Sequence, residues 1–280
     1  MKLSPRINWM LRGVLALVFA FVLVRTAMAV SVSPLGIYIN GRERSSVVTL
    51  FNDGTLPEEV NISFAFGYPQ SDSLGNLAVA LTDTAPAGEP SALGWIRAFP
   101  RRVLLQPGQR QAVRILVDPP EDLEDGEYWA RVLIKSRGGR PPVEAQSEDG
   151  ITVVVDVETT LAIPASFRMG DVETGIEITR GEATLAHDTV VATLDLARTG
   201  NAAFLGRMQV DVLDAEGDVI GEYEEHLGVY RELRRVARIA VEADRQPASV
   251  RVRIDTRRDD LPADGPLPAD RVTHTIEIAR

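Results

Sequence analysis

Short runs of alternating apolar and polar residues limit this chain more than any other feature of its sequence. In Glu58–Gly67 one face is wholly apolar, formed by Val60, Ile62, Phe64 and Phe66. The same period of two returns in Gln111–Asp118, Gly126–Ser136 and Ile151–Val157. Because successive side chains of a strand point to opposite faces, this period is typical of half-buried strands. Turn signals roughly every 8–12 residues, such as "NDG" and "QPGQ", favour an antiparallel sandwich over alternating strands and helices.

Residues 1–29 are predicted to be a cleaved signal peptide. Lys2, Arg6 and Arg12 form a basic start, an apolar run follows in Gly13–Val24, and "AMA" supplies small residues at 27–29. An apolar run of 12 residues is too short for a membrane helix, which needs about 20. We therefore expect an exported chain that begins at Val30 and has no membrane span. The sequence contains no cysteine, so the exported fold must depend on its hydrophobic core instead of disulfides.

The remaining 251 residues carry 26 basic and 40 acidic side chains, a balance of −14. Such an acidic surface repels phosphate backbones, so nucleic acid is not an expected partner. This length fits two domains of about 100–150 residues. Leu161–Ser166 ("LAIPAS") is predicted to be the hinge, because proline cannot donate to a sheet ladder and tends to end a strand. The expected division is 30–162 and 163–280, each a β-sandwich.

The second half repeats the strand pattern from Gly175–Arg180 to His274–Ala279. Two runs that flank Asp214–Asp218 predict a hairpin. The segment Glu222–Val241 has near-helical spacing at Leu227, Tyr230 and Leu233, but Gly228 and the alternation of Ala237, Ile239 and Val241 favour strands. Tyr68–Gly94 and Ser136–Gly150 are expected to be long loops, because both are rich in turn-forming residues.

Residues that could carry catalysis or bind metal are sparse. His187, His226 and His274 lie in separate segments without ligand or triad spacing, and no glycine-rich phosphate loop occurs. Asp214, Glu216 and Asp218 have the wrong glycine position for a calcium loop and indicate a turn. With no cysteine and no His–Glu pair at helical spacing, zinc catalysis is poorly supported. We expect no enzyme activity, no metal and no cofactor.

Three segments in a familiar order suggest a family: Ala29–Gly54, Phe99–Asp118 and Leu123–Ser136. They resemble the first domain of the periplasmic chaperones of the chaperone–usher pilus pathway, over roughly Val30–Pro164. "LEDGEY" also has the leucine and tyrosine spacing of the tyrosine corner of immunoglobulin-like domains, at Leu123 and Tyr128. The resemblance implies two immunoglobulin-like domains in tandem, a periplasmic location, and pilus or fimbrial subunits and an outer-membrane usher as partners.

In that family the last strand of the first domain fills a groove in an incomplete subunit, a process called donor-strand complementation. The resemblance assigns this role to Ile151, Val153, Val155 and Val157, which share one face of a strand. Alternatively, these side chains line the domain's own core, and Val154 on the opposite face offers a second apolar side chain for that purpose.

The sequence departs from the family at a pair of basic residues that bind the subunit's C-terminal carboxylate. The matching positions here hold Gly36 and Thr160, which carry no charge, so the anchor is left unassigned. Arg42 and Arg44 lie beside the following turn and are expected to be solvated.

A different hypothesis is an exported adhesive or structural module that binds a partner through its loops at 68–94 and 255–271, because binding in sandwiches often resides on loops.

Overall fold

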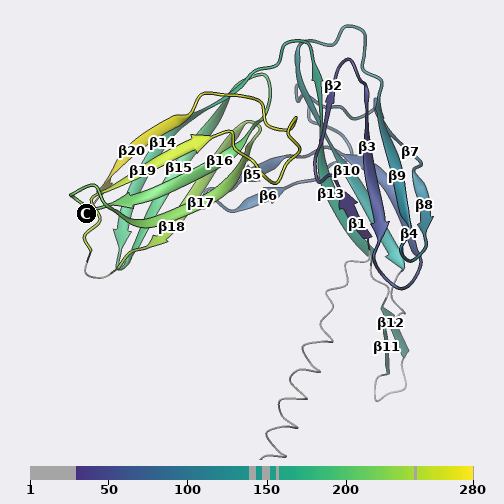
Figure 1. Ribbon diagram of the computed structural model, residues 1–280, viewed down its shortest axis with the longest axis horizontal. Coiled ribbons are helices and arrows are strands. Elements are labelled where there is room, and N and C mark those ends of the chain that lie inside the picture. Colours follow the sequence, from purple (N-terminus) through teal and green to yellow (C-terminus); the bar gives the residue numbers. More distant parts are fainter. Residues whose placement is uncertain (1–29, 139–142, 147–151, 156–157, 243–244, 280) are drawn as a thin grey trace, which may run out of the picture.

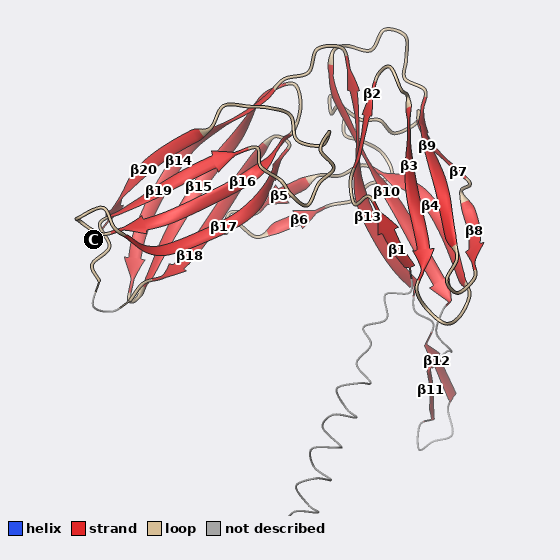
Figure 2. Cartoon of the chain, viewed as in Figure 1, coloured by secondary structure: helices blue, strands red, loops and turns tan. Residues whose placement is uncertain are grey.

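The computed structural model describes residues 30–138, 143–146, 152–155, 158–242 and 245–279, with only the backbone path given for 143–146 and 152–155. This described part consists of strands and loops and contains no helix, and so none that could cross a membrane (Figure 2). Two immunoglobulin-like β-sandwiches follow one another in the chain and meet at an angle (Figure 1). The predicted fold class is therefore confirmed. The predicted signal peptide lies outside the described residues.

The first sandwich is built from a four-stranded and a five-stranded sheet. The order of the first sheet is β1 (Val30–Ser33), β3 (Ser45–Asn52), β9 (Arg110–Val117) and β7 (Ile96–Phe99). The order of the second is β2 (Ile37–Asn40), β13 (Glu158–Met169), β10 (Gly126–Gly138), β4 (Glu58–Ala65) and β8 (Arg102–Leu105). The alternating apolar residues of both sheets meet in one core, among them Leu50, Val60, Ile62, Val113, Ile115, Val132 and Ile134.

The second sandwich is one continuous sheet whose two halves pack on each other. Its order is β17 (Val219–Val229), β16 (Phe204–Leu213), β19 (Ser249–Asp255), β20 (Val272–Ala279), β14 (Thr174–Ala186), β15 (Thr189–Gly200) and β18 (Glu232–Ala240). A short parallel pairing of β14 with β20 joins the halves. The hairpin predicted around Asp214–Asp218 connects β16 to β17, and Glu222–Val241 contains strands, as predicted.

The tyrosine corner predicted from "LEDGEY" is confirmed. Tyr128 donates a hydrogen bond of 2.9 Å from its hydroxyl to the backbone oxygen of Glu124, four residues upstream. Leu123 packs against the first core beside it. The bond fastens the start of β10, which is the central strand of its sheet.

The hinge predicted at Leu161–Ser166 is wrong. Strand β13 continues through these residues to Met169, and Ile163, Ala165 and Phe167 belong to the first core. The predicted boundary between residues 162 and 163 therefore falls inside a strand. Pro164 is tolerated because the ladder to β2 begins only at Ala165, so the missing N–H deprives no neighbouring strand of a bond.

The predicted loop at Tyr68–Gly94 contains a small hairpin of β5 (Pro69–Ser71) and β6 (Leu77–Val79). This hairpin leaves the first sandwich and packs against β18 of the second (Figure 1). Contacts between residues far apart in the sequence therefore link the two sandwiches, in addition to the chain connection after Met169.

Candidate functional site

The edge of β13 is open over half of its length. On one side β13 pairs antiparallel with β10 along all of Glu158–Met169. On the other side β2 pairs only with Ala165–Arg168. Among the described residues, the stretch Glu158–Pro164 therefore has a neighbouring strand on one side only. Residues 158–160 are exposed, and their unpaired edge is a ready template for another strand.

A second hairpin extends beyond this edge. Strands β11 (Val143–Gln146) and β12 (Thr152–Val155) pair with each other and form a two-stranded sheet of their own. Figure 1 shows this hairpin projecting past the end of the first sandwich. Of the four residues predicted to enter a subunit, Val153 and Val155 lie on the backbone of β12. Ile151 and Val157 lie outside the described residues.

The structure does not bring together the two positions that match the family's basic pair. Gly36 is buried immediately before β2, beside the ring of Tyr38. Thr160 is exposed on β13 opposite Lys135, whose Nζ lies 3.7 Å from Glu158 Oε1. Ile37, the residue after Gly36, pairs with Ala165, and Thr160 lies five residues before Ala165 on β13, roughly 16 Å from it. Arg42 and Arg44 are exposed, as expected.

A buried ion pair that the sequence did not indicate lies where the two sandwiches meet. Arg168 on β13 donates from Nε to Oε2 of Glu127 on β10 at 2.8 Å, and the two side chains are 5% and 0% exposed. Arg168 also donates to the backbone oxygens of Asp264 and Gly265, in the loop between β19 and β20. Glu127 Oε1 accepts from Trp129 Nε1 at 2.9 Å and from the amide of Ala203 at 3.3 Å. Arg168 and Glu127 thus each form hydrogen bonds to both sandwiches.

An aromatic cluster fills the rest of the contact between the sandwiches. Tyr68 and Trp129 of the first sandwich pack on Tyr230 of the second, with ring centres 5.5 and 4.9 Å from that of Tyr230. Phe66 and Ala203 complete this buried group. Burial raises the pKa of the Tyr230 hydroxyl. A desolvated aromatic contact of this kind is typical of a fixed interface and resists sliding of one sandwich on the other.

Both long loops take part in these contacts. In the first loop, Ser71 Oγ accepts from the amide of Arg234 at 2.7 Å, and the backbone oxygen of Gly75 accepts from Arg235 Nη1 at 2.9 Å. Glu89 accepts from Arg231 at 3.1 Å. The second loop supplies the two carbonyl groups bound by Arg168. An adhesive or structural module that bound its partner through these loops would have to do so while both loops also contact the other sandwich.

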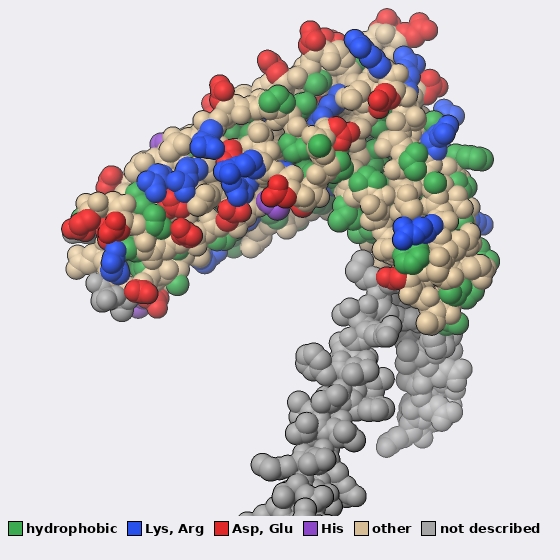
Figure 3. Space-filling model, in the orientation of Figure 1, with side chains coloured by type: hydrophobic (Ala, Val, Ile, Leu, Met, Phe, Trp, Pro, Cys, Tyr) green, Lys and Arg blue, Asp and Glu red, His purple; other side chains and the backbone are tan. Residues whose placement is uncertain are grey.

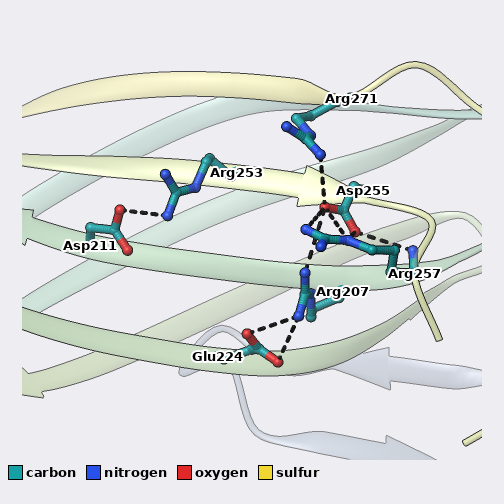
Figure 4. A network of polar contacts seen from close by, with 7 residues as sticks. All are labelled: Arg207, Asp211, Glu224, Arg253, Asp255, Arg257 and Arg271. Carbon is teal, nitrogen blue, oxygen red and sulfur yellow. Dashed lines mark hydrogen bonds and ion pairs between the residues drawn. The ribbon is translucent and has the colours of Figure 1, made fainter. Parts of the chain in front are cut away.

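The outer face of the second sandwich has a network of ion pairs, drawn in Figure 4. Asp255 contacts Arg207, Arg257 and Arg271, and its hydrogen bond with Arg257 is the main cause of a lowered pKa. Asp211 Oδ2 contacts Arg253 at 2.8 Å. Arginines and acids alternate over this face, as they do on the visible surface of the molecule (Figure 3). The opposite charges of this network are largely paired with each other.

The histidines and the acidic turn lie as the sequence suggested. His187 is in the turn between β14 and β15, His226 on β17 and His274 on β20, each in a different place. Asp214 accepts from the amide of Asp218 at 2.8 Å and from Arg245 at 2.6 Å, so its carboxylate organises a turn. Within the described ranges, no three histidine, aspartate or glutamate side chains cluster as metal ligands would.

No family model and no curated protein matches this sequence. Several solved structures match in shape. The YadV chaperone is 11% identical, with a TM-score of 0.47, over 89% of this chain and all of its own. The SafB chaperone of Salmonella enterica, solved with the SafA pilin, is 13% identical, with a TM-score of 0.43, over 90% of this chain and 98% of that one. CsuC of Acinetobacter baumannii, solved with the tip subunit CsuE, is 12% identical, with a TM-score of 0.44, over 90% and 99%. All three likenesses are at low sequence identity and at TM-scores below 0.5.

Proposed function

We propose that this chain is a periplasmic chaperone that binds subunits of a surface fibre by lending them a β-strand and delivers them to an outer-membrane usher. The observation that supports this most directly is the open edge of β13 at Glu158–Pro164, continued by the projecting hairpin of β11 and β12. An extended segment of another chain can add to such an edge through backbone hydrogen bonds, and alternate side chains then set specificity.

The alternation along β13 supports the choice of donor residues. Leu161, Ile163 and Phe167 face the first core, so odd-numbered positions lie on the apolar face of this strand. A strand that continued without a bulge toward residue 151 would keep Val153, Val155 and the two other predicted residues on that face.

The energy available from these side chains is sufficient for the task. Fully burying one valine or isoleucine stabilises by about 1.5–3 kcal/mol, so four would supply roughly 6–12 kcal/mol. Folded domains are stable by only about 5–15 kcal/mol. The donated strand could therefore decide whether an incomplete subunit stays folded. On this account folding of the subunit supplies the free energy, so the chaperone has no need of a cofactor or catalytic residues.

The test is a double substitution, Val153→Asp with Val155→Asp, compared with Val219→Asp on the exposed start of β17. Each variant carries an affinity tag and is purified from the periplasm of its host, and bound proteins are identified by mass spectrometry. We expect wild type and Val219→Asp to recover a small β-rich exported subunit, and the double variant to recover none at an unchanged melting temperature. Undiminished recovery by a folded double variant would disprove strand donation.

Loop truncation separates this proposal from the adhesive or structural module. Shortening 68–94 or 255–271 would abolish partner binding by a loop-borne site. For a strand donor it would loosen the contact between sandwiches but leave the edge of β13 in place.

A further inference from the structure

The outer face of the second sandwich has a small cavity among arginines. Side chains alternate between the two faces of a strand, and Val252 and Ile254 of β19 are buried, so Arg253 and Asp255 lie on the outer face. Strand β16 borders the cavity on one side, and the chain just before β20 borders it on the other. Its volume of about 310 Å³ is near the lower end of the range of small-ligand sites. It is lined by Arg207, Gln209, Arg253, Asp255, Arg257 and Arg271.

The acidic side chains of this region lie deeper than the arginines. Figure 4 shows Arg207, Arg257 and Arg271 reaching Asp255 from three different segments of the chain. The side chain of Asp255 is 14% exposed, whereas those of the four lining arginines are between 21% and 62% exposed. The carboxylate therefore holds the guanidinium groups together from beneath and leaves them accessible to a ligand.

The arginines of this region outnumber the acids that act on them. Four arginines and one aspartate line the cavity. Beyond the lining, Glu224 contacts Arg207, Asp259 acts on Arg257, and Asp211 contacts both Arg253 and Arg251. Five arginines thus stand against four acids, in a chain that has 26 basic and 40 acidic residues after residue 29. Figure 3 shows this concentration of basic side chains over β16 and β19.

Two of the arginines have most of their donors free. The contact of Arg271 with Asp255 is 3.6 Å long, too long for a hydrogen bond, and Arg271 makes no hydrogen bond to the described residues. Arg253 contacts Asp211 through Nη2 alone. Each guanidinium carries five N–H donors, and its planar fork fits the oxygens of a phosphate. A phosphate group also has a charge near −2 and several acceptor oxygens, so it can bind more than one guanidinium at once.

We propose that this cavity binds a phosphate group, carried either by a soluble phosphate ester or by the headgroup of an anionic lipid. Arg253 and Arg271 donate to the phosphate oxygens, while Arg207 and Arg257 add positive charge around them. The site is independent of strand donation, because it is formed by β16, β19 and the residues next to β19 and β20 and does not involve β13.

The test uses the chain from Val30, without the predicted signal peptide, at low ionic strength. Titration calorimetry compares glycerol 3-phosphate with acetate, and sedimentation compares phosphatidylcholine vesicles with vesicles that also contain phosphatidylglycerol. We expect glycerol 3-phosphate to bind at least about tenfold more tightly than acetate, because one carboxylate cannot use donors from several arginines. Binding to the phosphatidylglycerol vesicles identifies a lipid headgroup as the source of the phosphate. Binding of glycerol 3-phosphate without vesicle binding identifies a soluble ester.

Arg271→Gln is expected to weaken the bound state at least about tenfold, and Arg271→Lys to restore part of it, because lysine keeps the charge but not the fork. Arg238→Gln is the matched control, because Arg238 is exposed on β18 and does not line the cavity. The proposal is overturned if wild type binds neither glycerol 3-phosphate up to about 10 mM nor the phosphatidylglycerol vesicles. It is also overturned if acetate binds as tightly as glycerol 3-phosphate, or if folded Arg271→Gln binds as wild type does. Should Arg271→Gln not fold, the comparison of the two anions on wild type decides.

Discussion

Replacing Arg168 by methionine tests whether the buried ion pair with Glu127 holds the two sandwiches together. Methionine keeps a flexible apolar stem but removes the bond to Glu127 and the two bonds to the carbonyl groups of Asp264 and Gly265. Removing one partner of a buried pair costs about 3–5 kcal/mol, because the other charge stays buried without compensation. Glu127 is 0% exposed but keeps the N–H donors of Trp129 and Ala203. We therefore expect a loss near the lower end, about 3 kcal/mol.

Urea unfolding followed by tryptophan fluorescence measures this loss. Trp129 is 1% exposed and donates to Glu127, so in a chain that starts at Val30, and therefore lacks Trp9, and that carries Trp95→Phe, its emission reports directly on the contact between sandwiches. Arg180→Met is the matched control, because Arg180 and Glu182 form a pair whose side chains are 63% and 57% exposed. Exposed pairs contribute about 0–1 kcal/mol, so this variant should unfold almost as the parent does.

The double variant Glu127→Leu with Arg168→Met sharpens the test. Replacing both partners by apolar groups leaves no unpaired charge, so it should be more stable than Arg168→Met alone. The reasoning is refuted if Arg168→Met unfolds within about 1 kcal/mol of the parent, or if the double variant is less stable than Arg168→Met alone.

Two further predictions concern the β5–β6 hairpin and the loss of stability at high pH. Gly75→Ala should lower the melting temperature and expose the β5–β6 hairpin to protease, because the new Cβ would lie 2.7 Å from Val236 Cγ2. Gly88→Ala is the control, because Gly88 has a similar φ but open space around it. Equal effects of the two substitutions would contradict the reasoning. Burial raises the pKa of Tyr38 above its ordinary value near 10, so its contribution to stability is complete below about pH 10 and is lost as the pH rises further. Between about pH 8 and about pH 11, the free energy of unfolding of Tyr38→Phe, measured in urea, should fall with rising pH less steeply than that of wild type. Identical slopes against pH for the two proteins would contradict the prediction.

The strands of both sandwiches could be predicted from local sequence because their signal is local. Val60 and Ile62, and likewise Val113 and Ile115, are two positions apart, and this spacing predicts which face of each strand packs against the core. The turn at Asp214–Asp218 could likewise be predicted, because a hydrogen bond within the turn itself stabilises it: Asp214 accepts from the amide of Asp218. The tyrosine corner could be predicted for the same reason, as donor and acceptor are four residues apart.

The end of the first sandwich could not be predicted in this way. Pro164 is a strong local signal for a break, yet the pairing of β13 with β10 continues on both sides of it. At Pro164 and Arg131 that pairing joins residues 33 positions apart, and it outweighs the local preference because the ladder to β2 begins only at Ala165.

Sequence alone determined the class of fold and the absence of disulfides, because hydrophobic period and residue type are properties of each short segment. Only the tertiary structure decided that Arg168 meets Glu127 and that half of β13 has an open edge. Each of these depends on which distant segments lie side by side. No single segment carries that information, because the free energy that selects the arrangement comes from burial and pairing across the whole chain.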